Sequence, residues 1–132
     1  MSIFGIGIDI VDNSRIKKLL LNKKLNFKNK IFTKKEITYC QKKSNIVNCY
    51  SKRFSAKEAF VKALGTGFRK KITFLDIEVL NNHYGKPYLF INKKVINKIK
   101  TSFKLKKFDI FLSVSDEKKY AIATVVISKQ WK

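Results

Sequence analysis

The sequence predicts an α+β fold in which helices pack against a mainly antiparallel sheet. Three observations support this prediction: a strand pattern opens the chain, helical patterns fill most of its first half, and two pairs of strand patterns with short turns fill most of its second half. Strands joined by short turns pair in antiparallel fashion. With 132 residues, the chain can bury a core and is expected to form one domain, residues 1–132.

The first strand is predicted over residues 2–12, where side-chain character alternates with period two. One face of this strand carries bulky side chains, and the other is nearly bare before an acidic residue. Another segment can therefore approach the backbone closely on the bare face. The bulky face holds Phe4, Ile6, Ile8 and Ile10, and the bare face holds Gly5, Gly7, Asp9 and Val11.

The segment after this strand has helical periodicity. A helix is predicted over residues 13–24 and begins at Asn13 or Ser14, since such side chains cap helix N-termini. Residues 25–31 are polar and lysine-rich, so they are predicted to be a connection.

Thr33 and Glu36 form a capping-box pattern that predicts a short helix after them. A longer helix is predicted over residues 45–64. Gly65 and Gly67 mark its end, because glycine takes positive φ angles without steric cost.

The second half of the chain alternates strand pairs with one helix. Polar turn residues separate the strands of each pair, and Pro87 opens the second strand of the first pair. The predicted elements are strands over 74–80 and 88–91, a helix over 93–102, and strands over 108–115 and 120–127.

The formal net charge of +21 indicates an acidic partner or a polyphosphate substrate. Nucleic-acid binding is the competing interpretation, but three features of the sequence argue against it. Arginine is scarce (Arg15, Arg53 and Arg69), the lysines are spread along the whole chain, and no nucleic-acid-binding motif is recognised. Compositional drift toward lysine, asparagine and isoleucine accounts for many of the lysines as well.

The chain is expected to be cytoplasmic and to have no membrane partner. No apolar run approaches the roughly 20 residues that cross a bilayer, and the apolar start lacks the basic segment and cleavage site of a signal peptide. Cys40 and Cys49 do not have the spacing of a metal site, so they are predicted to be free thiols in a reducing compartment.

Two acidic residues occupy positions that a core normally avoids: Asp9 in the first strand and Glu58 in the long helix. If the bare strand face packs against this helix, the two carboxylates converge in a plausible Mg²⁺ site, because Mg²⁺ binds one or two carboxylates, waters and substrate phosphates. Lys62, one helical turn after Glu58, and Arg53, five residues before it, would then contact phosphate oxygens.

Each of these features also has a purely structural interpretation. Asp9 can be a satisfied buried acid, Glu58 and Lys62 can be a surface ion pair, and Gly65 and Gly67 can simply stop a helix. The residues by themselves therefore support no more than Mg²⁺-dependent handling of a phosphate compound.

Five segments, in this order, resemble the bacterial holo-acyl-carrier-protein synthases, a branch of the 4′-phosphopantetheinyl transferases. The resemblance covers essentially the whole chain, and the combination of an acid in the first strand with the helix motif is specific. The segments are GIGIDIVDNSRI (5–16), FTKKEITYC (32–40), KRFSAKEAFVKALGTG (52–67), YGKPYL (84–89) and LSVSDEKKYAIATVV (112–126).

The resemblance implies that phosphopantetheine moves from coenzyme A to a serine of apo-acyl carrier protein, in fatty acid biosynthesis, with release of adenosine 3′,5′-bisphosphate. It implies Asp9 and Glu58 as Mg²⁺ ligands, and Glu58 and Lys62 as catalytic residues, with Lys62 at the coenzyme A phosphates. The other residues that it implies near coenzyme A are Arg53, Gly65, Gly67, Gly85, Lys86 and Pro87.

The resemblance also implies a homotrimer with sites between subunits, and an acidic carrier protein as partner. The basic outward face of the first helix, which includes Arg15 and Lys18, is expected to dock that carrier. A related transferase serving other carriers is a further alternative, but such enzymes are usually longer, two-lobed chains.

Asp116 departs from the family pattern, because many members have histidine at this position. A role given to that histidine does not transfer to this chain. The base that accepts the serine proton stays unassigned: a metal-activated water and Glu58 acting through water are both open.

Overall fold

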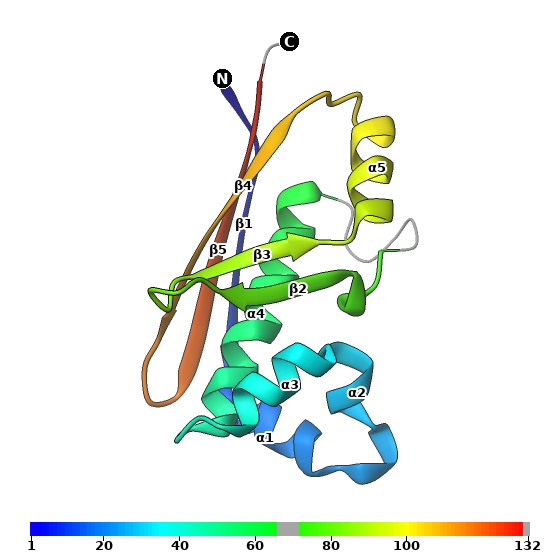
Figure 1. Cartoon of the computed structure of the whole chain (residues 1–132). Helices are drawn as coiled ribbons and strands as arrows, with labels where there is room; N and C mark the ends of the chain where they lie inside the picture. Colours follow the sequence, from blue (N-terminus) through cyan, green and yellow to red (C-terminus); the bar gives the residue numbers. More distant parts are fainter. Residues whose placement is uncertain (66–71, 131–132) are drawn as a thin grey trace.

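The computed structural model describes residues 1–65 and 72–130. The predicted order of strands and helices is confirmed, with three short additions, α2 and the 3₁₀ turns η1 and η2 (Figure 1). The elements are β1 (Ser2–Asp12), α1 (Asn13–Leu21), η1 (Lys23–Leu25), α2 (Phe27–Ile31), α3 (Lys34–Gln41), α4 (Ile46–Leu64), η2 (Phe74–Asp76), β2 (Ile77–Asn81), β3 (Pro87–Ile91), α5 (Lys93–Ser102), β4 (Phe108–Asp116) and β5 (Tyr120–Lys129).

All strand pairs are antiparallel, as predicted, but they form two sheets. The larger sheet has the order β1-β5-β4, and the β2–β3 hairpin forms a separate two-stranded sheet. Helix α4 runs along one face of the larger sheet, with the hairpin and α5 on the side of α4 away from that sheet and α1 to α3 gathered at one end (Figure 1). The α+β prediction is therefore confirmed.

The glycines of β1 allow α4 to lie directly on the strand. A Cβ atom placed on Gly5 would lie 1.9 Å from the carbonyl oxygen of Ala63, and one on Gly7 would lie 1.8 Å from that of Ala59. Both distances are far below van der Waals contact, so no larger residue fits without displacing the helix. The prediction of a close backbone approach is confirmed, and the segment that approaches is α4.

A register irregularity between Ile3 and Gly5 changes the faces of β1. Phe4 packs into the core, with its ring centroid 5.1 Å from that of Phe103. The prediction that Phe4 shares a face with the isoleucines is wrong, because a bulge inverts the alternation at that point. The isoleucine face is turned away from α4 and exposed: Ile6, Ile8 and Ile10 are 58–64% accessible.

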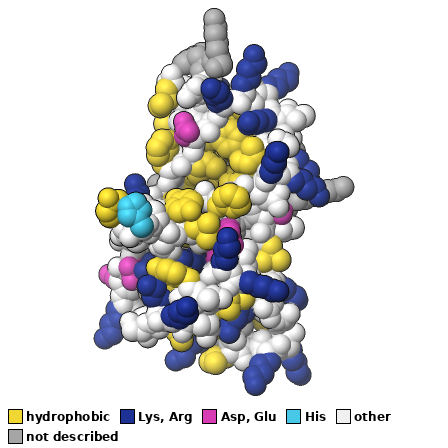
Figure 2. Space-filling model, viewed as in Figure 1, with side chains coloured by type: hydrophobic (Ala, Val, Ile, Leu, Met, Phe, Trp, Pro, Cys, Tyr) yellow, Lys and Arg dark blue, Asp and Glu magenta, His cyan; other side chains and the backbone are white. Residues whose placement is uncertain are grey.

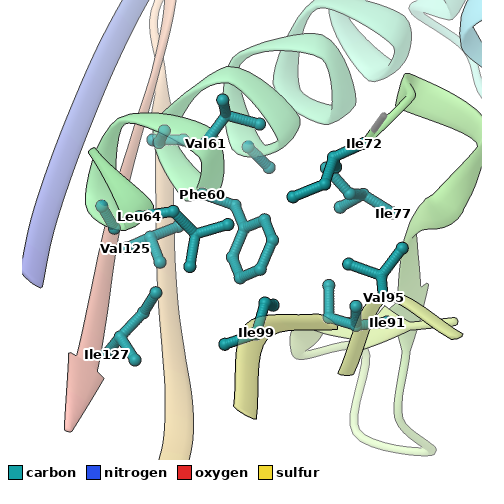
Figure 3. Close-up of a cluster of buried hydrophobic side chains, with 14 of the residues drawn as sticks. Phe60, Val61, Leu64, Ile72, Ile77, Ile91, Val95, Ile99, Val125 and Ile127 are labelled. Atoms are coloured by element: carbon teal, nitrogen blue, oxygen red, sulfur yellow. The ribbon is translucent and has the colours of Figure 1, made fainter. Parts of the chain in front are cut away.

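The main core lies between α4, α5, the hairpin and β5. Phe60 of α4 is fully buried and lies among the aliphatic side chains of these elements (Figure 3). A second cluster, around Ile16, Phe32 and Tyr50, joins the first helices to α4. Burial of these clusters fixes the position of α4 against β1, α3 and β2.

Several local predictions need correction. Residues 25–31 are not a simple connection, because Phe27 and Ile31 pack into the second cluster and residues 27–31 form α2. Asp12, not Asn13 or Ser14, caps α1: its Oδ1 accepts the N–H of Ser14 at 2.8 Å. The predicted strand over 74–80 begins only at residue 77, after a 3₁₀ turn. The capping box of Thr33 with Glu36 is confirmed.

The prediction of two free thiols is wrong, because Cys40 and Cys49 form a disulfide. The two cysteines are nine residues apart in the chain, on two different helices. The end of α3 and the first turn of α4 meet, so the two Cα atoms lie 5.5 Å apart. This is within the range that a disulfide spans. Among the described helices, none has the length and apolar character needed to span a bilayer.

Candidate active site

Asp9 and Glu58 lie on facing surfaces of β1 and α4. Both carboxylates are partly buried. Burial raises the pKa of Asp9, and Lys62 opposes this effect. Burial also raises the pKa of Glu58, and the negative charge of Asp9 raises it further. The two carboxylates are thus close enough to repel each other, as the glycine face of β1 leads one to expect.

Lys62 reaches across from α4 to β1. Its Nζ atom lies 3.2 Å from Oδ1 of Asp9 and 3.0 Å from the carbonyl oxygen of Ile8. The surface-pair interpretation, in which Lys62 contacts only Glu58 along the helix, therefore does not describe this side chain. The ammonium group is half-exposed, so it remains accessible to a ligand at the same place.

The donor set fits Mg²⁺. Two facing carboxylates would share a divalent cation, which would relieve the repulsion that raises the pKa of Glu58. Within residues 1–65 and 72–130, no cluster of three or more His, Cys, Asp or Glu side chains could hold a metal. Mg²⁺ is commonly bound by one or two protein carboxylates together with water and substrate phosphate, whereas Zn²⁺ and Ca²⁺ sites usually have more protein ligands.

Arg15 of α1 borders this cluster. Its positive charge lowers the pKa of both Asp9 and Glu58, although burial outweighs that effect. Its guanidinium carbon lies 5.8 Å from the centre of the Phe54 ring, and the side chain is exposed. Lys18 is exposed on the next turn of α1. The basic face of α1 therefore begins beside the two carboxylates.

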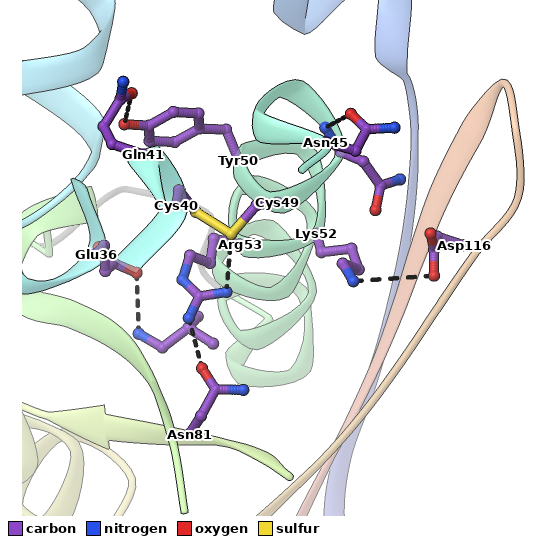
Figure 4. The surroundings of a disulfide bond; sticks show 12 residues. Glu36, Cys40, Gln41, Asn45, Cys49, Tyr50, Lys52, Arg53, Asn81 and Asp116 are labelled. Atoms are coloured by element: carbon purple, nitrogen blue, oxygen red, sulfur yellow. Dashed lines mark hydrogen bonds and ion pairs between the residues drawn. A yellow bond between two sulfur atoms is a disulfide. The ribbon is translucent and has the colours of Figure 1, made fainter. Parts of the chain in front are cut away.

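Arg53 lies in a different place, a pocket of about 340 Å³ between α3, α4, β2 and β4. Its Nη2 atom donates to Oδ1 of Asn81 at 2.6 Å (Figure 4). Its guanidinium lies 4.2 Å from the centre of the Tyr39 ring. The side chain is buried, and its Nε has no hydrogen-bond partner among residues 1–65 and 72–130. Burial lowers the pKa of Arg53, and Glu36 opposes this.

The predicted site residues therefore form two groups. Asp9, Glu58 and Lys62 form one, and none of the three lines the Arg53 pocket. Arg53 stands five residues before Glu58 on α4, about 140° around the helix, so the two side chains leave it on different sides.

Of the three predicted coenzyme A residues around the turn after β2, two line the Arg53 pocket and one does not. Gly85 and Pro87 line it, whereas Lys86 is exposed and is not part of the lining. Gly65 ends α4 with φ of 79°, as predicted, near the end of the helix that carries Lys62. Gly67 lies outside the described residues.

Comparison with known proteins decides the family. The family model of the 4′-phosphopantetheinyl transferase superfamily matches residues 5–125. The chain belongs to this family.

Individual relatives and solved structures agree. The chain is 48% identical to a holo-[acyl-carrier-protein] synthase of Pelagibacter ubique over 98% of this chain and 100% of that protein. It is 50% identical to one of Halothermothrix orenii over 92% and 94% of the two chains. A holo-[acyl-carrier-protein] synthase structure from Neisseria meningitidis matches with a TM-score of 0.83 and 36% identity, covering 96% of this chain and 99% of that one.

Several of the matching structures contain coenzyme A, and two of them illustrate the match. One is a Bacillus anthracis synthase in complex with CoA (3′,5′-ADP), with a TM-score of 0.79, 36% identity, and coverage of 98% and 100%. The other is a Helicobacter pylori synthase in complex with coenzyme A, with a TM-score of 0.77, 32% identity, and coverage of 93% and 99%. Relatives with the same fold as this phosphopantetheinyl transferase therefore bind coenzyme A.

Sequence reasoning missed several residues of the transferase's pocket. Tyr39 contacts Arg53. Asn81 also contacts Arg53, and Lys52 and Asp116 form an ion pair at 3.9 Å (Figure 4). Tyr39 belongs to an ordinary helical pattern and Asn81 to a polar turn, so neither residue carries a sequence signal that sets it apart. Asp116 lines the pocket, so the position where many family members have histidine belongs to this pocket and not to the Asp9–Glu58 pair.

Proposed function

We propose that this chain is a holo-[acyl-carrier-protein] synthase of fatty acid biosynthesis. It transfers the 4′-phosphopantetheine group of coenzyme A to a serine hydroxyl of apo-acyl carrier protein. The observation that carries this proposal is the meeting of Asp9, Glu58 and Lys62 in a family member whose relatives hold coenzyme A. Residues 1–132 act as one transferase domain, for which a cytoplasmic location stays a prediction.

Asp9 and Glu58 would hold Mg²⁺. When bound, the ion neutralises charge on the diphosphate of coenzyme A. Lys62 then contacts the diphosphate oxygens, because its ammonium already lies 3.2 Å from Asp9 and is half-exposed. The serine oxygen forms a bond to the phosphorus that carries pantetheine, and the bond from that phosphorus to the leaving adenosine 3′,5′-bisphosphate breaks. The acceptor of the serine proton remains unassigned.

The Arg53 pocket would hold the nucleotide part of coenzyme A. Arg53 supplies a buried cation whose Nε has no partner in the described part of the chain, and Tyr39 supplies an aromatic surface. Gly85 and Pro87 line the same pocket, and Lys86 stands beside it in the turn. A guanidinium and an aromatic ring are suited to phosphate and to a base.

The two groups lie at opposite edges of the larger sheet. Asp9 pairs with Ala123 of the middle strand, and Ala123 pairs with Val114, which lines the Arg53 pocket. Helix α4 packs over the middle strand between them. One ligand would contact both groups if the β4 edge of one subunit lay beside the β1 edge of the next.

A head-to-tail interface forms a closed ring when its rotation closes. The family resemblance implies three subunits, so we infer a homotrimeric ring. The surface available for it is the face of the sheet turned away from α4. Ile6, Ile8, Ile10 and Phe111 are 54–64% exposed there, although a monomeric protein normally buries such side chains.

The acyl carrier protein would dock on the basic face of α1. Arg15 lies within electrostatic range of Asp9 and Glu58, so a carrier held there would present its serine near the two carboxylates. Lys18, exposed on the same helix, extends the basic face. The chain as a whole carries a formal charge of +21, which attracts an acidic partner and speeds encounter. Lys and Arg side chains cover much of the visible surface (Figure 2).

Mass spectrometry tests the proposed reaction directly. Apo-acyl carrier protein incubated with this chain, coenzyme A and Mg²⁺ should gain the mass of one phosphopantetheine group, and EDTA should prevent the gain. Absence of any gain across several acyl carrier proteins would overturn the proposal.

A further inference from the structure

Glu36 of α3 and Lys57 of α4 form an ion pair with almost no exposure: 1% and 0% of the two residues are accessible. Nζ of Lys57 lies 2.6 Å from Oε1 of Glu36, and it also donates to the carbonyl oxygens of Ile31 at 2.6 Å and Phe74 at 3.1 Å. These three acceptors use all three ammonium protons. Lys57 precedes Glu58 in the chain, yet it takes no part in the Asp9–Glu58–Lys62 cluster.

The carboxylate of Glu36 joins three elements. Its Oε1 accepts from Lys57 of α4 and, at 3.0 Å, from the N–H of Thr33 at the start of α3. Its Oε2 accepts from the N–H of Val79 of β2 at 3.0 Å. Hydrogen bonds to a buried carboxylate are directional and costly to lose, so this side chain fixes α3, α4 and β2 relative to one another.

These three elements are also walls of the Arg53 pocket (Figure 4). On α3, Tyr39 lies one helical turn after Glu36. On α4, Arg53 lies one helical turn before Lys57, the partner of Glu36. Asn81 lies two residues after the anchored N–H of β2, on the same face of that strand. The guanidinium lies 4.2 Å from the Tyr39 ring and bonds Asn81 at 2.6 Å.

We propose that Glu36 is a positioning residue for coenzyme A, because it holds Tyr39, Arg53 and Asn81 in the arrangement that receives the nucleotide. The proposal rests on the proposed function, which places the nucleotide in the Arg53 pocket. A buried ion pair adds little net stability over apolar residues of similar size, whereas it does fix geometry through its hydrogen bonds. The pair therefore acts on the affinity for coenzyme A and not on the chemical step.

The decisive variant is Glu36→Gln. Glutamine keeps the shape but has one accepting oxygen for three donors, so at least one of Lys57, Thr33 and Val79 loses its partner. The matched control is Glu78→Gln. The Glu78 carboxylate lies on β2, and among the described hydrogen bonds it accepts only from the Thr33 hydroxyl. Calorimetry would measure coenzyme A binding, and steady-state transfer would measure KM and kcat.

We expect Glu36→Gln to weaken coenzyme A binding and raise its KM by about tenfold or more, with kcat at saturating coenzyme A and KM for the carrier within about twofold of wild type. Glu78→Gln should change neither KM. An unchanged coenzyme A KM in a folded Glu36→Gln protein, or equal losses for both substrates, would overturn the proposal.

A double variant decides the question if Glu36→Gln does not fold. Glu36→Leu with Lys57→Met replaces the pair by apolar side chains, which is often neutral for stability. A folded double variant with weakened coenzyme A binding supports the positioning role, and one with wild-type binding overturns it. Wild-type protein that transfers no phosphopantetheine would instead refute the proposed function, so the two failures are distinguishable.

Discussion

Lys62 of α4 bonds Asp9 of β1 across the contact between helix and strand, with 3.2 Å between Nζ and Oδ1. Residues 53 positions apart in the chain meet because Gly5 and Gly7 leave no Cβ atoms between the two backbones. The ammonium therefore lies beside the place where we propose that a metal ion and the diphosphate of coenzyme A bind. The proposed reaction depends on residues at that contact, and the first of the following predictions tests them.

Replacing Glu58 by glutamine should reduce phosphopantetheine transfer by about a hundredfold or more, because one of two carboxylates for Mg²⁺ is lost. Thermal unfolding should change little, since the side chain is only partly buried. Transfer is measured by mass spectrometry of the carrier. Glu117→Gln, an exposed carboxylate in the β4–β5 turn, is the control. A Glu58→Gln protein with the wild-type rate would remove this residue from the metal site.

The apparent affinity for Mg²⁺ should fall as the pH is lowered from neutral toward the raised pKa values of Asp9 and Glu58. Burial raises the pKa of Asp9 and Glu58, so protons begin to compete with the metal at a higher pH than at ordinary carboxylates. The charged forms that bind Mg²⁺ are fully present above the raised pKa values and are lost below them. Titration of activity with Mg²⁺ at several pH values measures this, and a pH-independent Mg²⁺ requirement would contradict it.

Arg15→Glu should raise KM for acyl carrier protein by about tenfold or more and leave KM for coenzyme A within about twofold. The reason is that an acidic carrier would meet a reversed charge at the start of α1. Lys100→Glu, which changes an exposed lysine on α5, is the matched control for net charge. Equal effects of the two substitutions would show that only overall charge matters.

Ile8→Glu should dissociate the proposed trimer and abolish transfer. The side chain is 60% exposed on the outer face of the sheet, so a carboxylate there is tolerated in a monomer but not within an apolar interface. Light scattering with size-exclusion chromatography measures the mass. Leu75→Glu, at a 46% exposed apolar residue in η2, is the control and should leave the mass unchanged. Wild-type protein that elutes as a monomer would refute the assembly.

Reduction of the Cys40–Cys49 disulfide should destabilise the fold by roughly 2–3 kcal/mol, which is the chain-entropy estimate for a loop of about ten residues. Denaturant unfolding with and without a dithiol reductant measures the difference. A variant with both Cys40→Ser and Cys49→Ser should not respond to the reductant. Alkylation of two thiols per chain in the unreduced protein would contradict the disulfide.

The sequence by itself determined most of the elements, their order, and the types of residue that we propose carry the chemistry. Period-two and helical patterns located β1, α4 and both strand pairs, because side-chain alternation follows directly from backbone geometry. The glycines of β1 even indicated that a helix could lie beside Asp9. The motif around Glu58 and Lys62 supported the family resemblance, since those spacings are local.

Only the tertiary structure decided which of these residues share a site. Helix geometry sends Arg53 and Glu58 to different sides of α4, and packing decides which groups each side meets: Tyr39 and Asn81 beside Arg53, and Asp9 beside Glu58. The Cys40–Cys49 disulfide and the Glu36–Val79 bond likewise join elements that are separate in the chain. Such contacts arise from burial of two apolar clusters around α4, a collective property of many side chains that no local pattern encodes.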